Sequence, residues 1–192
     1  MTGVLDLNQY MIRGKFWKIF GNKFWFEDVN EKRYGFCEQK RFKLKEDIRI
    51  YVDESKSHEW LKIKQKQMVD AWGGYDIMDS VSGEHIGTVR RKFWASVLRT
   101  RWHLLDAAGN EVGMLIEDSM GYALVRRIFL GRLLPKKFHI EIGGGGEFVT
   151  MRQMFNPFIK KLVVNIPPSH PLDRRFIAGL AIVIAAIDGR GK

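Results

Sequence analysis

The amino-acid sequence predicts a mainly β fold, a closed antiparallel β-barrel of roughly 11–13 strands that encloses an apolar C-terminal helix. Two observations lead to this prediction. The segment from Phe176 to Ile187 contains no polar side chain, and the residues before it form a succession of short alternating segments joined by glycine-containing turns. A helix that is apolar all round must be covered on every side. A closed barrel covers it and leaves no sheet edge exposed.

Length and composition are those of one folded domain, residues 1–192, which can bury a sizeable core. The single cysteine, Cys37, cannot form an intrachain disulfide and favours a reducing compartment. Residues 1–6 lack the basic and then apolar run of a signal peptide, so we expect a cytoplasmic protein. The formal net charge of +10 predicts attraction to anions. Anionic lipid, nucleic acid and acidic proteins are therefore all candidate partners.

Hairpins are predicted along the chain, and they share a pattern. An apolar strand ends in aspartate, a turn follows, and the next strand begins with apolar residues. The clearest copies are Tyr75–Val89 and Trp102–Leu115, and weaker copies are Phe24–Phe36 and Ile48–Ile63. Aspartate suits the corner because its carboxylate can accept hydrogen bonds from nearby backbone N–H groups. Glycine supplies the positive φ that tight hairpin turns require.

The end of the chain is predicted to form more strands and then the helix. Two strands flank the glycine run 143–146, and a last strand, Leu162–Ile166, precedes a proline-rich corner. The helix is expected over about residues 173–188, capped by Asp173 and ended by Gly189. Its apolar run of 12 residues is about 18 Å long, too short for the ~30 Å hydrocarbon core of a bilayer. We expect the helix to be buried in the barrel, with Asp173 as its cap and with Phe176, Leu180, Ile184 and Ile187 as its core residues.

The hairpins, the basic strands and above all the segment from Asp173 to Asp188 resemble the LURP-one-related proteins. These belong with the phospholipid scramblases to the tubby C-terminal-like superfamily. The resemblance covers nearly the whole chain and implies a barrel of about twelve strands around a central C-terminal helix. The scramblases carry an acidic segment before that helix. The matching segment here, Pro167–Asp173, has a single acid, which argues against calcium binding because calcium needs several oxygen ligands.

The sequence contains no constellation that predicts catalysis or metal binding, and we expect no cofactor. The histidines are scattered, and a single cysteine excludes a cysteine-rich zinc site. His103 near Asp106 and His139 near Glu141 are interpreted as outward-facing strand residues. The run 143–146 leads into a strand rather than a helix, which favours a hairpin turn over a phosphate-binding loop. A non-enzymatic protein is the prediction.

Basic residues are the candidates for binding anionic phospholipid. Lysines alternate with uncharged residues over positions 62–66, so one strand would present them on a single outer face about 7 Å apart. Over positions 125–137, basic residues are interleaved with apolar ones, a combination suited to a membrane surface. The competing interpretation is ordinary barrel surface and core. The candidate residues are Lys62, Lys64, Lys66, Arg126, Arg127, Arg132, Lys136 and Lys137.

The predicted function is association with anionic phospholipid, peripheral at a membrane surface. The alternative is a nucleic-acid-binding or regulatory protein-interaction module that uses the same charge. Tryptophans interleaved with basic residues could stack on single-stranded bases. In a wide barrel we expect them instead to fill the space between wall and helix. These residues are Trp17, Trp25, Trp60, Trp72, Trp94 and Trp102.

Overall fold

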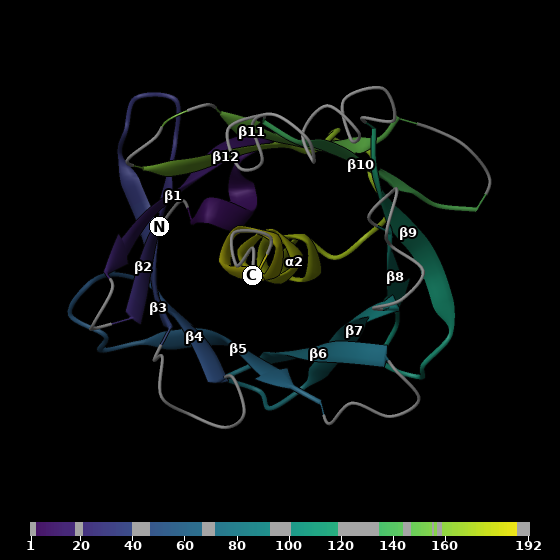
Figure 1. The fold of residues 1–192 in the computed structure, drawn as a ribbon. Helices are drawn as coiled ribbons and strands as arrows, with labels where there is room; N and C mark the ends of the chain where they lie inside the picture. Colours follow the sequence, from purple (N-terminus) through teal and green to yellow (C-terminus); the bar gives the residue numbers. More distant parts are fainter. Residues whose placement is uncertain are drawn as a thin grey trace.

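The structure, a computed structural model, describes residues 3–17, 21–39, 47–66, 72–92, 101–118, 135–143, 147–154, 156 and 159–187. Within these residues, twelve antiparallel strands close into one barrel, in which β1 pairs with β12 (Figure 1). The predicted fold class is therefore confirmed. The strands are β1 (Gln9–Trp17), β2 (Gly21–Glu27), β3 (Arg33–Gln39), β4 (Asp47–Tyr51), β5 (Glu59–Gln65), β6 (Trp72–Asp79), β7 (His85–Lys92), β8 (Arg101–Leu105), β9 (Glu111–Glu117), β10 (Lys137–Glu141), β11 (Val149–Met154) and β12 (Lys160–Asn165).

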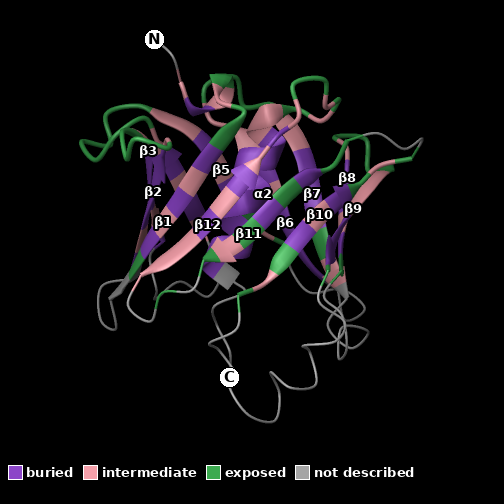
Figure 2. Ribbon diagram, turned by 90° about the horizontal axis from the view of Figure 1, so that it is seen from above, coloured by how far each residue is buried: buried purple, intermediate pink, exposed green. Residues whose placement is uncertain are grey.

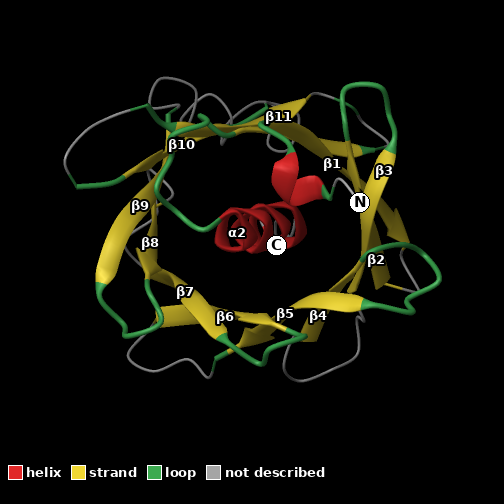
Figure 3. Ribbon diagram, turned by 180° about the vertical axis from the view of Figure 1, so that it is seen from behind, coloured by secondary structure: helices red, strands yellow, loops and turns green. Residues whose placement is uncertain are grey.

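The barrel interior is filled by alternate strand residues and by one helix, α2 (Arg174–Ile187), which the strands surround (Figure 3). In β4, Ile48 and Ile50 are fully buried, whereas Arg49 between them is only half-buried. Twelve strands ~4.8 Å apart and tilted by ~40° give a barrel about 24 Å across. A helix with its side chains is about 10–12 Å wide, so a single layer of wall side chains fills the space around it.

The helix is buried along its length, as predicted. Phe176, Leu180 and Ile184 belong to the core, each no more than 3% exposed. Asp173 is the N-cap, since its Oδ1 accepts a hydrogen bond of 2.7 Å from the backbone N–H of Arg175. Ile187 is the last helical residue, and its side chain lies outside the described part of the structure, as does Gly189.

Two arginines fix the start of α2 to distant parts of the chain. Arg174 donates to the backbone oxygens of Leu5 and Leu7, at 3.2 and 2.8 Å, beside a short 3₁₀ turn, η1 (Val4–Asp6). Arg175 donates to Asp79 at 2.8 Å and to Glu84 at 3.0 Å, on either side of the β6–β7 turn. The helix is thus held in the barrel by polar contacts at its N-terminus in addition to its apolar sides.

The barrel has two distinct ends (Figure 2). At the upper end, as drawn there, lie η1, the start of α2 and the turns that join each even-numbered strand from β2 to β10 to the next strand. At the lower end lie the last turn of α2, the last residues of the odd-numbered strands and the first residues of the even-numbered strands that follow them. We use the names upper end and lower end in this sense throughout.

Four successive hairpins at the upper end have an aspartate where the first strand leads into the turn. Each carboxylate accepts hydrogen bonds of 2.8–3.0 Å from backbone N–H groups of its own turn. This arrangement satisfies backbone donors that a tight turn leaves unpaired. The predicted role of the corner aspartates is confirmed. They are Asp28, Asp53, Asp79 and Asp106.

The same four hairpins share a β-bulge. In each one the register shifts by one residue just after the turn, so that one residue of the second strand has no partner opposite it. The extra residues occur at intervals of 26 positions and all pack against the core from the upper end. They are Tyr34, Trp60, Ile86 and Val112.

Gly87 shows why a glycine follows the extra residue in the Tyr75–Val89 hairpin. A Cβ built on Gly87 would lie 2.5 Å from the backbone oxygen of Leu105 and 2.7 Å from the ring of Phe176. Real Cβ atoms do not approach that closely, so the neighbouring strand and the helix can pack here only against glycine. The glycine that follows Ile86 is therefore a packing feature of the barrel wall.

Candidate functional site

The lysines of β5 occupy one outer face of the barrel, as their spacing predicts. Leu61 and Ile63 are fully buried in the core, whereas Lys62 is half-buried and Lys64 is exposed. Lys66 follows the last residue of β5 and is also exposed. The alternation of the strand therefore places all three ammonium groups outside the core.

Acidic side chains of the neighbouring strands lie among these lysines. Lys64 is opposite Asp47 of β4 and Asp76 of β6 in the ladder. Asp47 is 3.9 Å from Lys62, and Asp76 is 3.0 Å from Lys66. Within the described residues, no carboxylate lies within 4.0 Å of Lys64. The predicted stripe is thus partly neutralised, and Lys64 is its member with the most available charge.

The segment 125–137 is described only from residue 135 onwards. Arg126, Arg127 and Arg132 lie outside the described residues. Lys136 is 3.6 Å from Glu117, a carboxylate that is almost fully buried. The ammonium group of Lys136 is therefore paired within the barrel wall. Lys137, the first residue of β10, is exposed. The two neighbouring lysines therefore differ in what they can offer to a partner.

The histidine pairs noted in the sequence do not form a catalytic arrangement. His103 lies 3.1 Å from Glu111 rather than beside Asp106. His139 contacts Asp118 and lies 2.9 Å from Glu141. Partial burial lowers the pKa of His139, but the hydrogen bonds to Glu141 and Asp118 outweigh it and raise the pKa above its ordinary value. Both imidazoles are bonded to carboxylates on the outer wall.

A second polar cluster on the wall contains a histidine, a hydroxyl and a carboxylate. Thr88 donates to Asp76 at 2.6 Å, and His85 lies 3.2 Å from the same hydroxyl. The threonine proton points to the carboxylate, and Thr88 is almost fully buried. His85 is therefore not placed as a base for an attacking hydroxyl. Among the described residues, no group of three or more His, Cys, Asp or Glu side chains is positioned to hold a metal ion.

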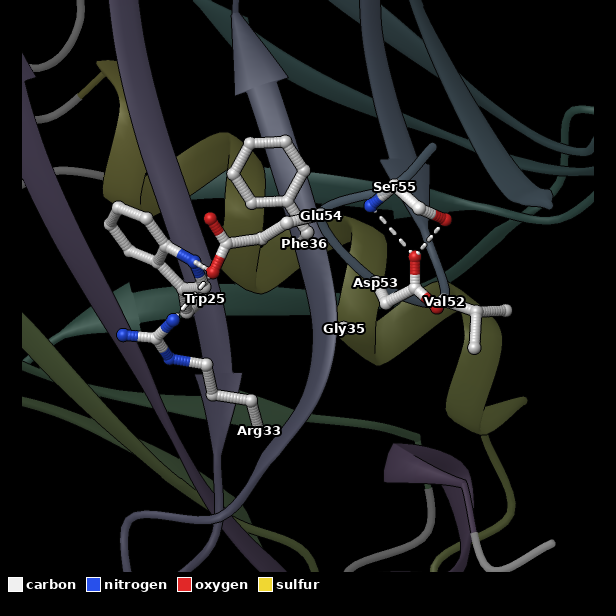
Figure 4. Close-up of a pocket in the computed structure, with 8 residues that line it drawn as sticks. All are labelled: Trp25, Arg33, Gly35, Phe36, Val52, Asp53, Glu54 and Ser55. Atoms are coloured by element: carbon white, nitrogen blue, oxygen red, sulfur yellow. Dashed lines mark hydrogen bonds and ion pairs between the residues drawn. The ribbon is translucent and has the colours of Figure 1, made fainter. Parts of the chain in front are cut away.

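A pocket of about 310 Å³ lies against the outer wall at β2 and β3 (Figure 4). Trp25 and Phe36 stand opposite each other there, with ring centroids 5.8 Å apart. Their chain neighbours Phe24, Phe26 and Cys37 belong to the core, so both rings face outward. They are nevertheless only 7% and 2% exposed, because the β4–β5 connection and basic side chains cover them.

Two polar groups of this pocket, those of Trp25 and Arg33, converge on one carboxylate. Glu54 Oε1 accepts a hydrogen bond of 2.8 Å from the indole N–H of Trp25 and lies 2.5 Å from the guanidinium of Arg33. That guanidinium also stands 5.2 Å from the centre of the Trp25 ring. The anion held at this point by Trp25 and Arg33 is therefore the carboxylate of Glu54 itself. These contacts hold the β4–β5 connection against the wall.

The tryptophans do not all behave as expected. Trp102 is buried in the core, and Trp60 packs partly against it. Trp25 is a correction, because it faces outward into the pocket instead of filling the space between wall and helix. Alternation within β2 indicates its outward direction, but the connection that covers it is distant in sequence. The side chains of Trp17, Trp72 and Trp94 lie outside the described residues.

The architecture places the chain in a class of twelve-stranded antiparallel barrels built around a C-terminal helix. The chain belongs to the LURP-one-related family, whose sequence profile matches residues 8–185. The match runs from the start of β1 almost to the end of α2, so the resemblance carried by the hairpins and the helix is confirmed. No curated protein matches the chain.

In the part of the chain that the structure describes, no helix combines the length and the apolar character needed to cross a bilayer.

Proposed function

We propose that this LURP-one-related barrel associates with anionic phospholipid at a membrane surface through basic side chains on its outer wall, without catalysing a reaction. The observation that carries the proposal is the outward exposure of basic side chains near strand ends, with Lys64 and Lys137 as the clearest examples. Both stand on strands whose alternate residues anchor the core. The positive charges of these two lysines are therefore held at fixed positions on the barrel wall.

The expected affinity is modest. Each basic residue near an anionic surface contributes about 1 kcal/mol. Four such residues amount to about 4 kcal/mol, which corresponds to a dissociation constant of about 1 mM. The apolar residues between positions 125 and 134 supply groups that can insert into the interface. We therefore expect reversible binding that weakens with added salt.

Charge reversal within the segment 125–137 tests the proposal. The variant replaces Arg126, Arg127, Arg132 and Lys137 with glutamate and keeps Lys136, because Lys136 is paired with the buried Glu117. The affinity for phosphatidylserine-containing vesicles, measured by cosedimentation, should fall roughly a thousandfold, because about 4 kcal/mol of binding free energy is lost. A thermal melt identical to that of the unmodified protein controls for folding. Unchanged cosedimentation would reject this segment as the lipid-binding element.

Nucleic acid is the alternative partner, and salt dependence separates the two. Affinity for DNA or RNA that falls steeply with salt and shows no sequence preference is attraction by charge alone. A specificity ratio of about a thousandfold between sequences would favour the alternative over lipid.

A further inference from the structure

The exposed side chains at the upper end of the barrel are predominantly acidic. Of the described residues there, the exposed basic ones are Lys32, Arg33 and Lys56. Two of these are engaged, since Arg33 pairs with Glu54 and Lys56 with Glu38. The exposed acidic residues at this end are Asp6, Glu31, Asp53, Glu54, Glu84, Glu111, Glu141, Glu147 and Asp173.

The described residues of the lower end have the opposite charge. Among the described residues at this end, Asp118 is the exposed acid, and it is hydrogen-bonded to His139. Exposed basic residues occur on several strands, including β1, β5, β8 and β11. These strands stand at different points around the barrel (Figure 1). The exposed basic residues at this end are Lys15, Lys64, Lys66, Arg90, Arg101, Lys137 and Arg152.

The acidic character of the upper end is built into its turns. Hydrogen bonds within the turns lower the pKa of Asp53, Asp79 and Asp106 below the ordinary value. At Asp28, desolvation raises the pKa, but the hydrogen bonds from the turn outweigh it, and the pKa is again lowered. These carboxylates therefore remain ionised well below neutral pH. The charge difference between the two ends is a fixed property of the fold.

We propose that the barrel meets an anionic phospholipid surface end-on, with its lower end against the lipid and its upper end facing away. This inference rests on the proposed lipid association and adds the face that carries it. Basic groups distributed around a rim about 24 Å across fit a flat surface better than a cylindrical duplex. The reverse orientation would press the acidic turns against lipid phosphates of the same sign.

Site-specific fluorescence distinguishes the two ends. Met154, the last residue of β11, is half-exposed at the lower end, and Val81, in the β6–β7 turn, is 84% exposed at the upper end. Met154→Cys and Val81→Cys would each be labelled with the environment-sensitive fluorophore NBD in the full chain. The native Cys37 is fully buried and is not expected to react. Unmodified protein treated with the same reagent is the control.

Phosphatidylcholine vesicles with and without phosphatidylserine are then added. Increased and blue-shifted emission at position 154 with anionic vesicles, and none at position 81, is the expected result. A response at position 81, or at neither position while the protein cosediments with vesicles, would overturn the end-on orientation and leave lipid association standing. Absence of cosedimentation would overturn both. A stronger response of position 154 to a DNA duplex than to vesicles would reject lipid as the partner.

Matched charge reversals provide a test without a label. Lys137→Glu and Lys32→Glu make the same change in net charge at exposed sites on opposite ends. Lys137→Glu should weaken binding to anionic vesicles by at least about fivefold, whereas Lys32→Glu should leave it within about twofold. Equal effects of the two variants would show that net charge, and not the lower end, governs binding.

Discussion

Asp79 shows how one side chain serves both a turn and the helix. Its Oδ1 accepts hydrogen bonds from the backbone N–H groups of Val81 and Ser82, and its Oδ2 accepts one from Arg175. The backbone bond from Ser82 is the main reason that the pKa of Asp79 is lowered, with Arg175 adding to it against partial burial. The alternating pattern of the hairpin predicts the turn contacts. It does not predict Arg175, which is brought to the turn only when the helix enters the barrel.

Acid should therefore destabilise the protein through Asp79. A carboxyl whose pKa is lower in the folded state stabilises it above the unfolded-state pKa, near 3.8, and this contribution is lost as pH falls through the folded-state pKa. We expect Asp79→Asn to cost about 1 kcal/mol at neutral pH. Its unfolding free energy should also depend less on pH below about 4 than that of the unmodified protein. Urea denaturation across that range measures both, and parallel pH curves would contradict the assignment.

Hairpins with a bulge are the repeated element of the barrel. Alternation and corner aspartates in the sequence are enough to predict the strands, because a two-residue period specifies which face is buried. The bulge itself is not predictable from the pattern of one hairpin. At Gly87, which follows one bulge, the chain packs closely against the backbone of Leu105 in the next strand, a contact that a single hairpin does not contain. The pocket over Trp25 escaped prediction for the same reason, since Glu54 reaches it from another hairpin.

Two glycines of one hairpin should respond oppositely to alanine. At Gly87 the new Cβ would lie 2.5 Å from a backbone oxygen, so Gly87→Ala should cost about 3 kcal/mol or more in unfolding free energy. At Gly74, in the facing strand β6, the nearest atom is 3.6 Å away, which is ordinary contact. Gly74→Ala should be neutral or stabilising by up to about 1 kcal/mol. Similar losses from both substitutions in urea denaturation would show that the close approach at Gly87 is not what limits stability.

The buried helix makes the barrel a single packed unit. Leu180 is fully buried at its centre, so Leu180→Asp would place an unpaired charge in the core, and we expect no folded protein. The control variant Val81→Asp places the same charge at an exposed position and should leave folding intact. Near-UV circular dichroism and thermal melts compare the two variants. A cooperative melt for Leu180→Asp like that of the unmodified protein would contradict the enclosed helix.

The sequence predicts the whole-molecule architecture better than the functional surface. Twelve apolar residues without a polar face require a complete surround, and together with the succession of predicted hairpins this requirement points to a barrel. The charge difference between the ends depends on which turn lies at which end, and this follows from the closed strand order. The lysines at 62–66 illustrate the difference. Their common face follows from alternation, but their pairing with Asp47 and Asp76 required the neighbouring strands.

Flotation of the unmodified protein with neutral and anionic vesicles across a salt series is the most direct test of the lipid association proposed here. The protein should float with phosphatidylserine-containing vesicles at low salt, partly retain binding at high salt through apolar insertion, and remain unbound with phosphatidylcholine alone. Equal flotation with both kinds of vesicle, or none with either, would contradict a basic surface that binds anionic phospholipid.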